Sequence, residues 1–139
     1  MKTLPTDREV LRCIFEMYAA QYPGPSKTEG AGENDPFMPI KVRHIAGHLN
    51  CQPELIFGRL YYHLESKYRY KQENAVLVSF FQINFEGRGH CVHFPYLASI
   101  LAALDDDHRR NTWTFWFSVA ALALSVAGIL AQVITARLT

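Results

Sequence analysis

The sequence has few cysteines, since only Cys13, Cys51 and Cys91 occur in 139 residues. An odd number of widely spaced cysteines argues against a disulfide framework and favours a reducing compartment. Net charge is also low, at +1, which gives no sign of a strong field that would attract nucleic acid. We recognise no signal peptide, so we expect the N-terminal part of the protein to be cytoplasmic.

Recognisable catalytic motifs are absent as well. The sequence contains no phosphate-binding loop, no nucleophile elbow, no paired carboxylates in an apolar setting and no cofactor fingerprint. His44 and His48 lie four residues apart near Cys51, and residues 90–93 form a second cluster, but neither set offers four metal ligands in compatible directions. We therefore expect no enzyme activity, no cofactor and no metal ion.

A stretch without any charged side chain covers residues 113–134. As a helix it would measure about 33 Å, enough to cross a hydrocarbon core of roughly 30 Å. A buried core helix is the alternative, and the length of the run favours a transmembrane helix. Trp113 and Trp116 suit the headgroup level, and arginines flank both ends. We expect a single-pass, tail-anchored protein of the cell membrane, with residues 95–112 as a juxtamembrane helix and residues 135–139 as a short tail.

Small residues repeat every four positions inside this stretch, at Ala123, Ala127 and Ala131, with Gly128 beside them. Small side chains at that spacing allow two membrane helices to approach closely. Gln132 is suited to hydrogen bonding across such a contact. The pattern predicts a homo-oligomer formed through the transmembrane helix, in contact with membrane lipid.

The N-terminal region begins with a helix signal. Thr6 and Glu9 have the spacing of a capping box, and apolar residues follow at helical spacing over residues 7–21. Glycine-rich, charged residues 23–36 predict a mobile loop. The apolar run at 37–42 contains a proline and predicts an edge strand.

Two short helices are predicted next, over residues 42–49 and from Pro53 to about residue 68. The line IKVRHIAGHLNCQPELIFGRLYYHLESKYRY, residues 40–70, resembles the helix-turn-helix of winged-helix domains. The positions that match are the core positions Ile45, Ala46, Leu49, Ile56 and Leu60, and Asn50 where the turn needs a left-handed residue.

Strand-forming residues 75–84, a glycine-bearing turn at 86–89 and residues 90–94 predict a hairpin that corresponds to the wing. The resemblance covers roughly residues 7–94. It implies a mainly α fold with a small β-hairpin, in which residues 1–94 form a winged helix-turn-helix domain with a wing at 75–94. The C-terminal transmembrane helix predicted above follows this domain.

Two kinds of binding are open for this domain. Outward apolar side chains on the second helix favour a protein or nucleoprotein partner; these are Leu55, Phe57, Tyr61 and Tyr62. The winged-helix resemblance also implies DNA binding by basic residues, and RNA is kept beside DNA as a nucleic-acid partner. These basic residues are Arg59, His63, Lys67, Arg69 and Arg88.

The combined features predict a membrane-anchored winged-helix interaction protein. One concrete version is a small membrane effector of a toxin-like or phage-defence (antiviral) type, in which released transmembrane helices assemble and perturb the bilayer. The alternative is a membrane-tethered DNA-binding transcription regulator, whose soluble domain would bind duplexes with salt-dependent affinity.

Overall fold

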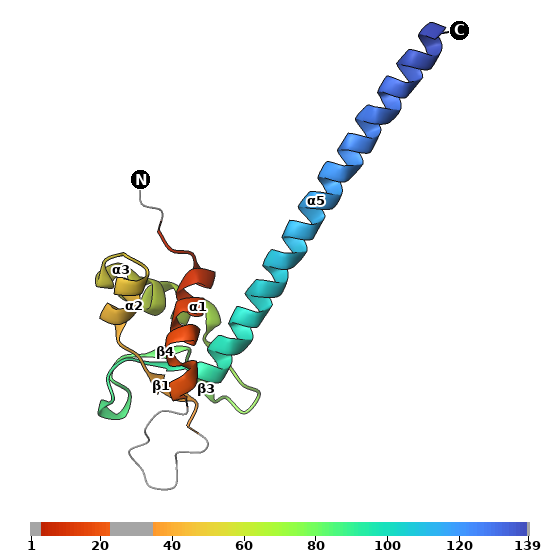
Figure 1. Ribbon diagram of the computed structural model, residues 1–139. Coiled ribbons are helices and arrows are strands. Elements are labelled where there is room, and N and C mark those ends of the chain that lie inside the picture. The colour runs from red at the N-terminus through yellow and green to blue at the C-terminus, as the bar shows by residue number, and fades with distance from the viewer. Residues whose placement is uncertain (1–3, 23–34, 139) are drawn as a thin grey trace. The chain divides into compact units, whose positions relative to one another are not determined.

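A computed structural model describes residues 4–22 and 35–138 of the chain. Most of the predicted mobile loop, residues 23–34, lies outside the described residues. The chain divides into two compact units, residues 1–102 and residues 103–139. The first unit is mostly helical with small antiparallel sheets, and the chain ends in the long apolar helix α5 (Figure 1).

Helix α1 spans Asp7–Tyr18 and continues as the 3₁₀ turn η1, Ala19–Gln21. The capping box predicted at its start is confirmed: the Thr6 hydroxyl accepts from the Glu9 amide at 3.3 Å, and the Glu9 carboxylate accepts from the Thr6 amide at 2.6 Å. Val10, Leu11 and Ile14 are buried along one face. The cap therefore sets the point where α1 begins, and the apolar face fixes α1 to the core.

Two further helices follow the first strand. Helix α2 spans Val42–His48, and after a turn the chain forms three consecutive helical segments, α3 (Pro53–Gly58), the π-helical η2 (Arg59–Leu64) and α4 (Glu65–Tyr68). Asn50 has a φ of 52°, which confirms the left-handed residue predicted in the turn. The side chains that these helices bury include the predicted core positions Ile45, Ala46, Ile56 and Leu60, and also Leu64.

A three-stranded antiparallel sheet has the order β1-β5-β4, formed by Phe37–Pro39, Cys91–His93 and Phe81–Gln82. Among the described strands, β1 pairs only with β5, with Met38 opposite Val92, so the prediction of an edge strand is confirmed. Phe80, Cys91 and Val92 are buried. The sheet therefore contributes to the same core as the helices.

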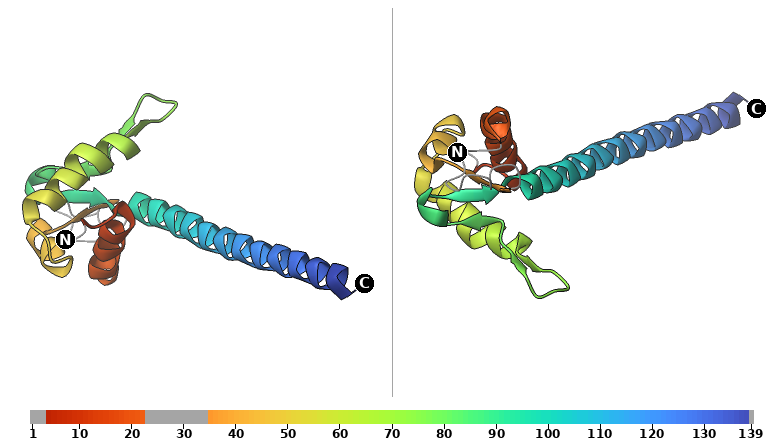
Figure 2. Two further views of the ribbon diagram at one scale, coloured as in Figure 1. Left: turned by 90° about the horizontal axis from the view of Figure 1, so that it is seen from above. Right: turned by 90° about the horizontal axis from the view of Figure 1, so that it is seen from below.

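The predicted single strand over residues 75–84 is wrong in its first half. Strand β3, Leu77–Val78, pairs with β2, Tyr70–Lys71, while β4 alone pairs with β5. Where the chain passes from one pairing to the other, the Glu65 carboxylate accepts the backbone N–H groups of Phe80 and Phe81. Figure 2 shows the β2–β3 hairpin extending from the end of α4.

Helix α5 spans Phe94–Leu138 without interruption, so residues 95–112 and 113–134 belong to one helix. Its first turn is capped by His93, whose Nδ1 accepts from the Tyr96 amide at 3.2 Å. Leu97, Ile100 and Leu101 are buried in the first unit. Residues 106–138 are exposed, and many of their side chains are large and apolar. A membrane or a second chain would cover these side chains.

Candidate functional site

Three of the four side chains predicted to bind a partner are exposed on α3 and η2. Leu55 is 46% exposed, Tyr61 39% and Tyr62 73%. The ring centroids of Tyr61 and Tyr62 lie 4.9 Å apart in an edge-on contact. Large apolar side chains that lie together on a surface are typical of contacts with another molecule. We refer to Leu55, Tyr61 and Tyr62 as the aromatic face.

Phe57 differs from these three because it is half-buried. Its ring stacks on Tyr61 at 5.6 Å between centroids and also meets the rings of Phe81 at 6.1 Å and His90 at 5.5 Å. Phe57 therefore supports the aromatic face from beneath and connects it to the turn that precedes β5. Restricting the ring of Tyr61 in this way reduces the entropy that binding would cost.

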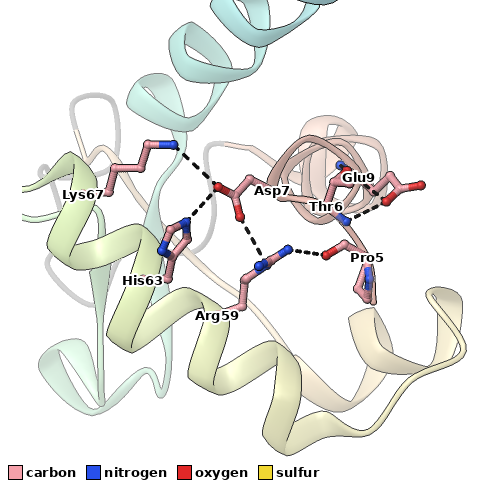
Figure 3. Close-up of polar contacts among 7 residues, drawn as sticks. All are labelled: Pro5, Thr6, Asp7, Glu9, Arg59, His63 and Lys67. Atoms are coloured by element: carbon pink, nitrogen blue, oxygen red, sulfur yellow. Dashed lines mark hydrogen bonds and ion pairs between the residues drawn. The ribbon is translucent and has the colours of Figure 1, made fainter. Parts of the chain in front are cut away.

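The basic side chains predicted to bind nucleic acid follow a different pattern, since three of them meet one carboxylate. Asp7 at the start of α1 forms ion pairs with Arg59 at 3.1 Å, His63 at 3.0 Å and Lys67 at 3.7 Å (Figure 3). These three residues are spaced by four, which places them on one face of the continuous helical segment. Arg59 also donates to the carbonyl of Pro5. The cluster joins the start of α1 to η2 and α4.

The other two predicted nucleic-acid-binding residues are also paired within the chain. Arg69 bonds to Glu65 at 2.8 Å, and Arg88 pairs with Asp35 at 2.6 Å and Glu86 at 3.4 Å. The Arg88 side chain is only 6% exposed. Arg59, Lys67, Arg69 and Arg88 thus each have a carboxylate partner, as does the His63 ring, and a phosphate would have to compete with those carboxylates.

The histidines and cysteines give no metal centre among residues 4–22 and 35–138, where no group of three or more His, Cys, Asp or Glu side chains is placed to hold an ion. Cys91 is buried and Cys13 half-buried, and burial is the main cause that raises the pKa of both thiols above the ordinary value. A raised pKa lowers the thiolate fraction, so these side chains are poor nucleophiles.

In the described part of the chain, α5 is the one helix long and apolar enough to cross a membrane, and its apolar segment is fully exposed. The hydroxyls inside it donate to carbonyls four residues earlier, at 3.0 Å for Thr114, 2.9 Å for Ser118 and 3.0 Å for Ser125. These polar groups therefore need no water, as a lipid environment requires. The helix is consistent with a single membrane span.

The residues predicted for helix association are all exposed on α5, namely Ala123, Ala127, Gly128 and Ala131. A Cβ added to Gly128 would meet nothing within 4 Å. The side-chain amide of Gln132 has no hydrogen-bond partner among the described residues. Trp113 and Trp116, predicted for the headgroup level, are 61% and 63% exposed.

No family model, curated protein or solved structure matches this chain. Function must therefore be argued from the chemistry of the described residues. Two of the residues that organise the unit, Asp7 and Glu65, were missed by the sequence analysis. The spacing of Arg59, His63 and Lys67 at intervals of four could have suggested that they share an acidic partner. Nothing in the sequence near these residues identified Asp7 as that partner.

Proposed function

We propose that this chain is a single-span membrane protein whose N-terminal unit has a winged-helix fold and binds a protein partner through the aromatic face. Helix α5 would hold that unit at the cytoplasmic side of the membrane. The observation that carries the proposal is the contrast on α3, η2 and α4, where apolar side chains are exposed while the cations are paired within the chain.

The order of elements supports the winged-helix assignment. A helix-turn-helix with a left-handed Asn50 is followed by two strands, β4 and β5, and β5 also pairs with β1, which precedes the motif. The β4–β5 pair supplies the hairpin that the winged-helix resemblance implies after the helix-turn-helix. The β2–β3 hairpin is then an insertion between the second helix and the wing.

A protein partner explains the aromatic face better than DNA does. Tyrosine supplies apolar area together with a hydroxyl that can remain hydrated, and is enriched at protein interfaces. DNA recognition instead needs unpaired Arg, Lys, Asn or Gln side chains that reach phosphates and base edges. Arg59 and Lys67 are already held by Asp7, so this surface offers little to a phosphate.

Membrane attachment is supported by α5 and by its flanks. The exposed apolar segment would bury its side chains among lipid tails, and the tryptophans at 113 and 116 would lie near the headgroups. Arg109 and Arg110 precede the segment, which fits a cytoplasmic N-terminal unit. Contact between α5 helices of two copies would bring two partner-binding units together.

The test of partner binding uses the full-length chain extracted in dodecyl maltoside from the cells that produce it. Proteins that copurify are quantified for the unmodified chain, for Leu55→Ala and Tyr62→Ala, and for the control Val76→Ala, which alters an exposed apolar side chain on the β2–β3 hairpin. We expect a specific partner that Val76→Ala retains and Tyr62→Ala loses, since an interface tyrosine contributes about 2 kcal/mol, or roughly 30-fold in affinity.

The same preparations are mixed with a duplex DNA at low salt to test the alternative regulator function. Partner recovery that is unchanged by both substitutions would contradict the aromatic face as the binding site. A duplex shift that weakens with added salt would favour DNA binding instead. Alkaline extraction of the membranes tests the span independently, because a transmembrane protein stays in the pellet.

A further inference from the structure

A cavity of about 640 Å³ lies on the N-terminal unit where the starts of α2 and α3 meet the turn before β5. Its wall has an apolar part, formed by Ile40, Pro53 and Phe57, beside cationic side chains that include Lys41 and Arg43. Cavities of this size accept one or two side chains of a bound segment. Phe57 is shared with the support of the aromatic face, so the cavity and that face adjoin.

The cations at this cavity differ from those on η2 and α4. Lys41 and Arg43 are exposed, and neither has an ion pair or side-chain hydrogen bond within residues 4–22 and 35–138. One carboxylate, Glu54, lies on the same wall. Arg88 also lines the wall, but Asp35 and Glu86 hold its side chain, so Lys41 and Arg43 are the wall cations that have no carboxylate partner within the described residues.

Two buried polar atoms at the wall also lack partners. The Nε of Arg88 and the Nδ1 of His90 are buried without a hydrogen bond in the described part of the chain, and both residues line the cavity. Native structures leave few such atoms unpaired. The Arg88 Nε–H is a donor, so a bound group with acceptor oxygens matches the chemistry of that atom and of the Lys41 and Arg43 side chains.

We propose that this cavity binds an acidic side chain of the protein partner, with an apolar side chain of the same segment against Pro53 and Phe57. This inference rests on the proposed function and names the partner chemistry. The carboxylate would lie between Lys41 and Arg43, where charge complementarity favours it. The apolar part of the wall would suit a hydrophobic side chain and gives nothing to a nucleic-acid backbone, which is why an acidic peptide is the better occupant.

The test selects peptides from a random 12-residue phage library on the full-length chain in dodecyl maltoside micelles. Enriched peptides are then synthesised, and their affinity is measured for the unmodified chain and for Lys41→Glu, Arg43→Glu and the control Lys71→Glu. Lys71 is an exposed cation on β2 that does not line the cavity. Circular dichroism of each variant checks that the fold is retained.

We expect enriched peptides to carry Asp or Glu beside an aromatic or aliphatic residue. Lys41→Glu and Arg43→Glu should each weaken their binding about fivefold or more, as expected for loss of an exposed ion pair and its replacement by repulsion. Lys71→Glu should leave the affinity within about twofold, which identifies the loss as local to the cavity.

Several results would overturn the inference: no enriched peptide, peptides without acidic residues, or equal weakening by Lys71→Glu. Binding of a 20-base-pair duplex that Lys41→Glu abolishes would also overturn it, because the wall would then be a phosphate site. Tyr62→Ala separates the two proposals. Peptides sensitive to Tyr62→Ala but not to Lys41→Glu support the aromatic face and refute the cavity, while the reverse pattern supports the cavity and refutes the aromatic face.

Discussion

Removing the Glu65 carboxylate should destabilise the N-terminal unit more than any substitution on its surface. Glu65 is only 3% exposed, and one of its oxygens accepts from the backbone amides of Phe80 at 2.7 Å and Phe81 at 2.6 Å. The other oxygen accepts from Arg69 at 2.8 Å. This carboxylate therefore replaces the strand partner that the chain lacks between β3 and β4.

The magnitude follows from the groups left unpaired in Glu65→Ala. Phe80 and Phe81 are buried, so each orphaned amide costs about 1–3 kcal/mol, or about 2–6 kcal/mol together. Arg69 is half-exposed and can be hydrated, so its loss adds little. Against a total stability of about 5–15 kcal/mol for a domain, this change removes a large fraction.

The assay is denaturant unfolding of the full-length chain in detergent, followed by near-ultraviolet circular dichroism. All seven tyrosines lie in the first unit, so their signal reports on that unit. Hydrogen exchange at Phe80 and Phe81 gives a local readout. Arg69→Ala is the control and should cost less than about 1 kcal/mol. The reasoning is refuted if Glu65→Ala costs no more than Arg69→Ala, or if the two amides keep their protection.

Three further predictions concern a helix cap, a charge cluster and the apolar helix α5. Burial lowers the pKa of His93 below its usual 6.5, so folding favours the neutral ring; stability should be full above pH 6.5 and fall as the pH drops below that value. His93→Asn keeps a capping acceptor for the Tyr96 amide and should flatten this part of a thermal-unfolding pH profile; an unchanged slope would contradict it. Asp7→Asn should lower the unfolding free energy by about 1 kcal/mol and, by releasing Arg59, His63 and Lys67, increase duplex binding at low salt in a gel-shift assay. A duplex affinity equal to that of the unmodified chain would show that these cations do not reach phosphates. Ala123→Leu and Ala127→Leu should reduce cross-linked dimers in membranes, whereas Val126→Leu, on a different face of α5, should not; equal dimer yields from all three would exclude association through the small-residue stripe.

Features with a local cause could be predicted from the sequence. The capping box at Thr6 and Glu9 needs only residues within one turn, and the left-handed backbone at Asn50 follows from the short turn between two helices. Pro39 limited its strand to the sheet edge for a similar reason, since it lacks a backbone donor. The apolar length of α5 was evident without any structure.

Features that depend on distant residues could not be predicted. The strand-forming run at 75–84 carries no sign that its halves pair with different strands, because the two partner strands and the Glu65 carboxylate between the pairings lie elsewhere in the sequence. Likewise, composition shows Arg88 as a cation at the tip of a turn, whereas Asp35 and Glu86 hold its side chain in the protein. Strand propensity and charge are local quantities, while strand partners and ion pairs are set by the tertiary fold.

The pairing of charges within the chain is the reason why we propose a protein partner and keep DNA binding as the alternative. The spacing of Arg59, His63 and Lys67 at intervals of four suits phosphate binding. In the structure, however, the Asp7 carboxylate contacts all three side chains. Once that face is used to attach α1, the same helical segment still exposes Leu55, Tyr61 and Tyr62, and the adjoining cavity has the unpaired cations Lys41 and Arg43 on its wall. A ligand that satisfies both must be apolar where it meets Tyr62 and acidic where it meets Lys41, and a protein segment combines those properties where a nucleic acid does not.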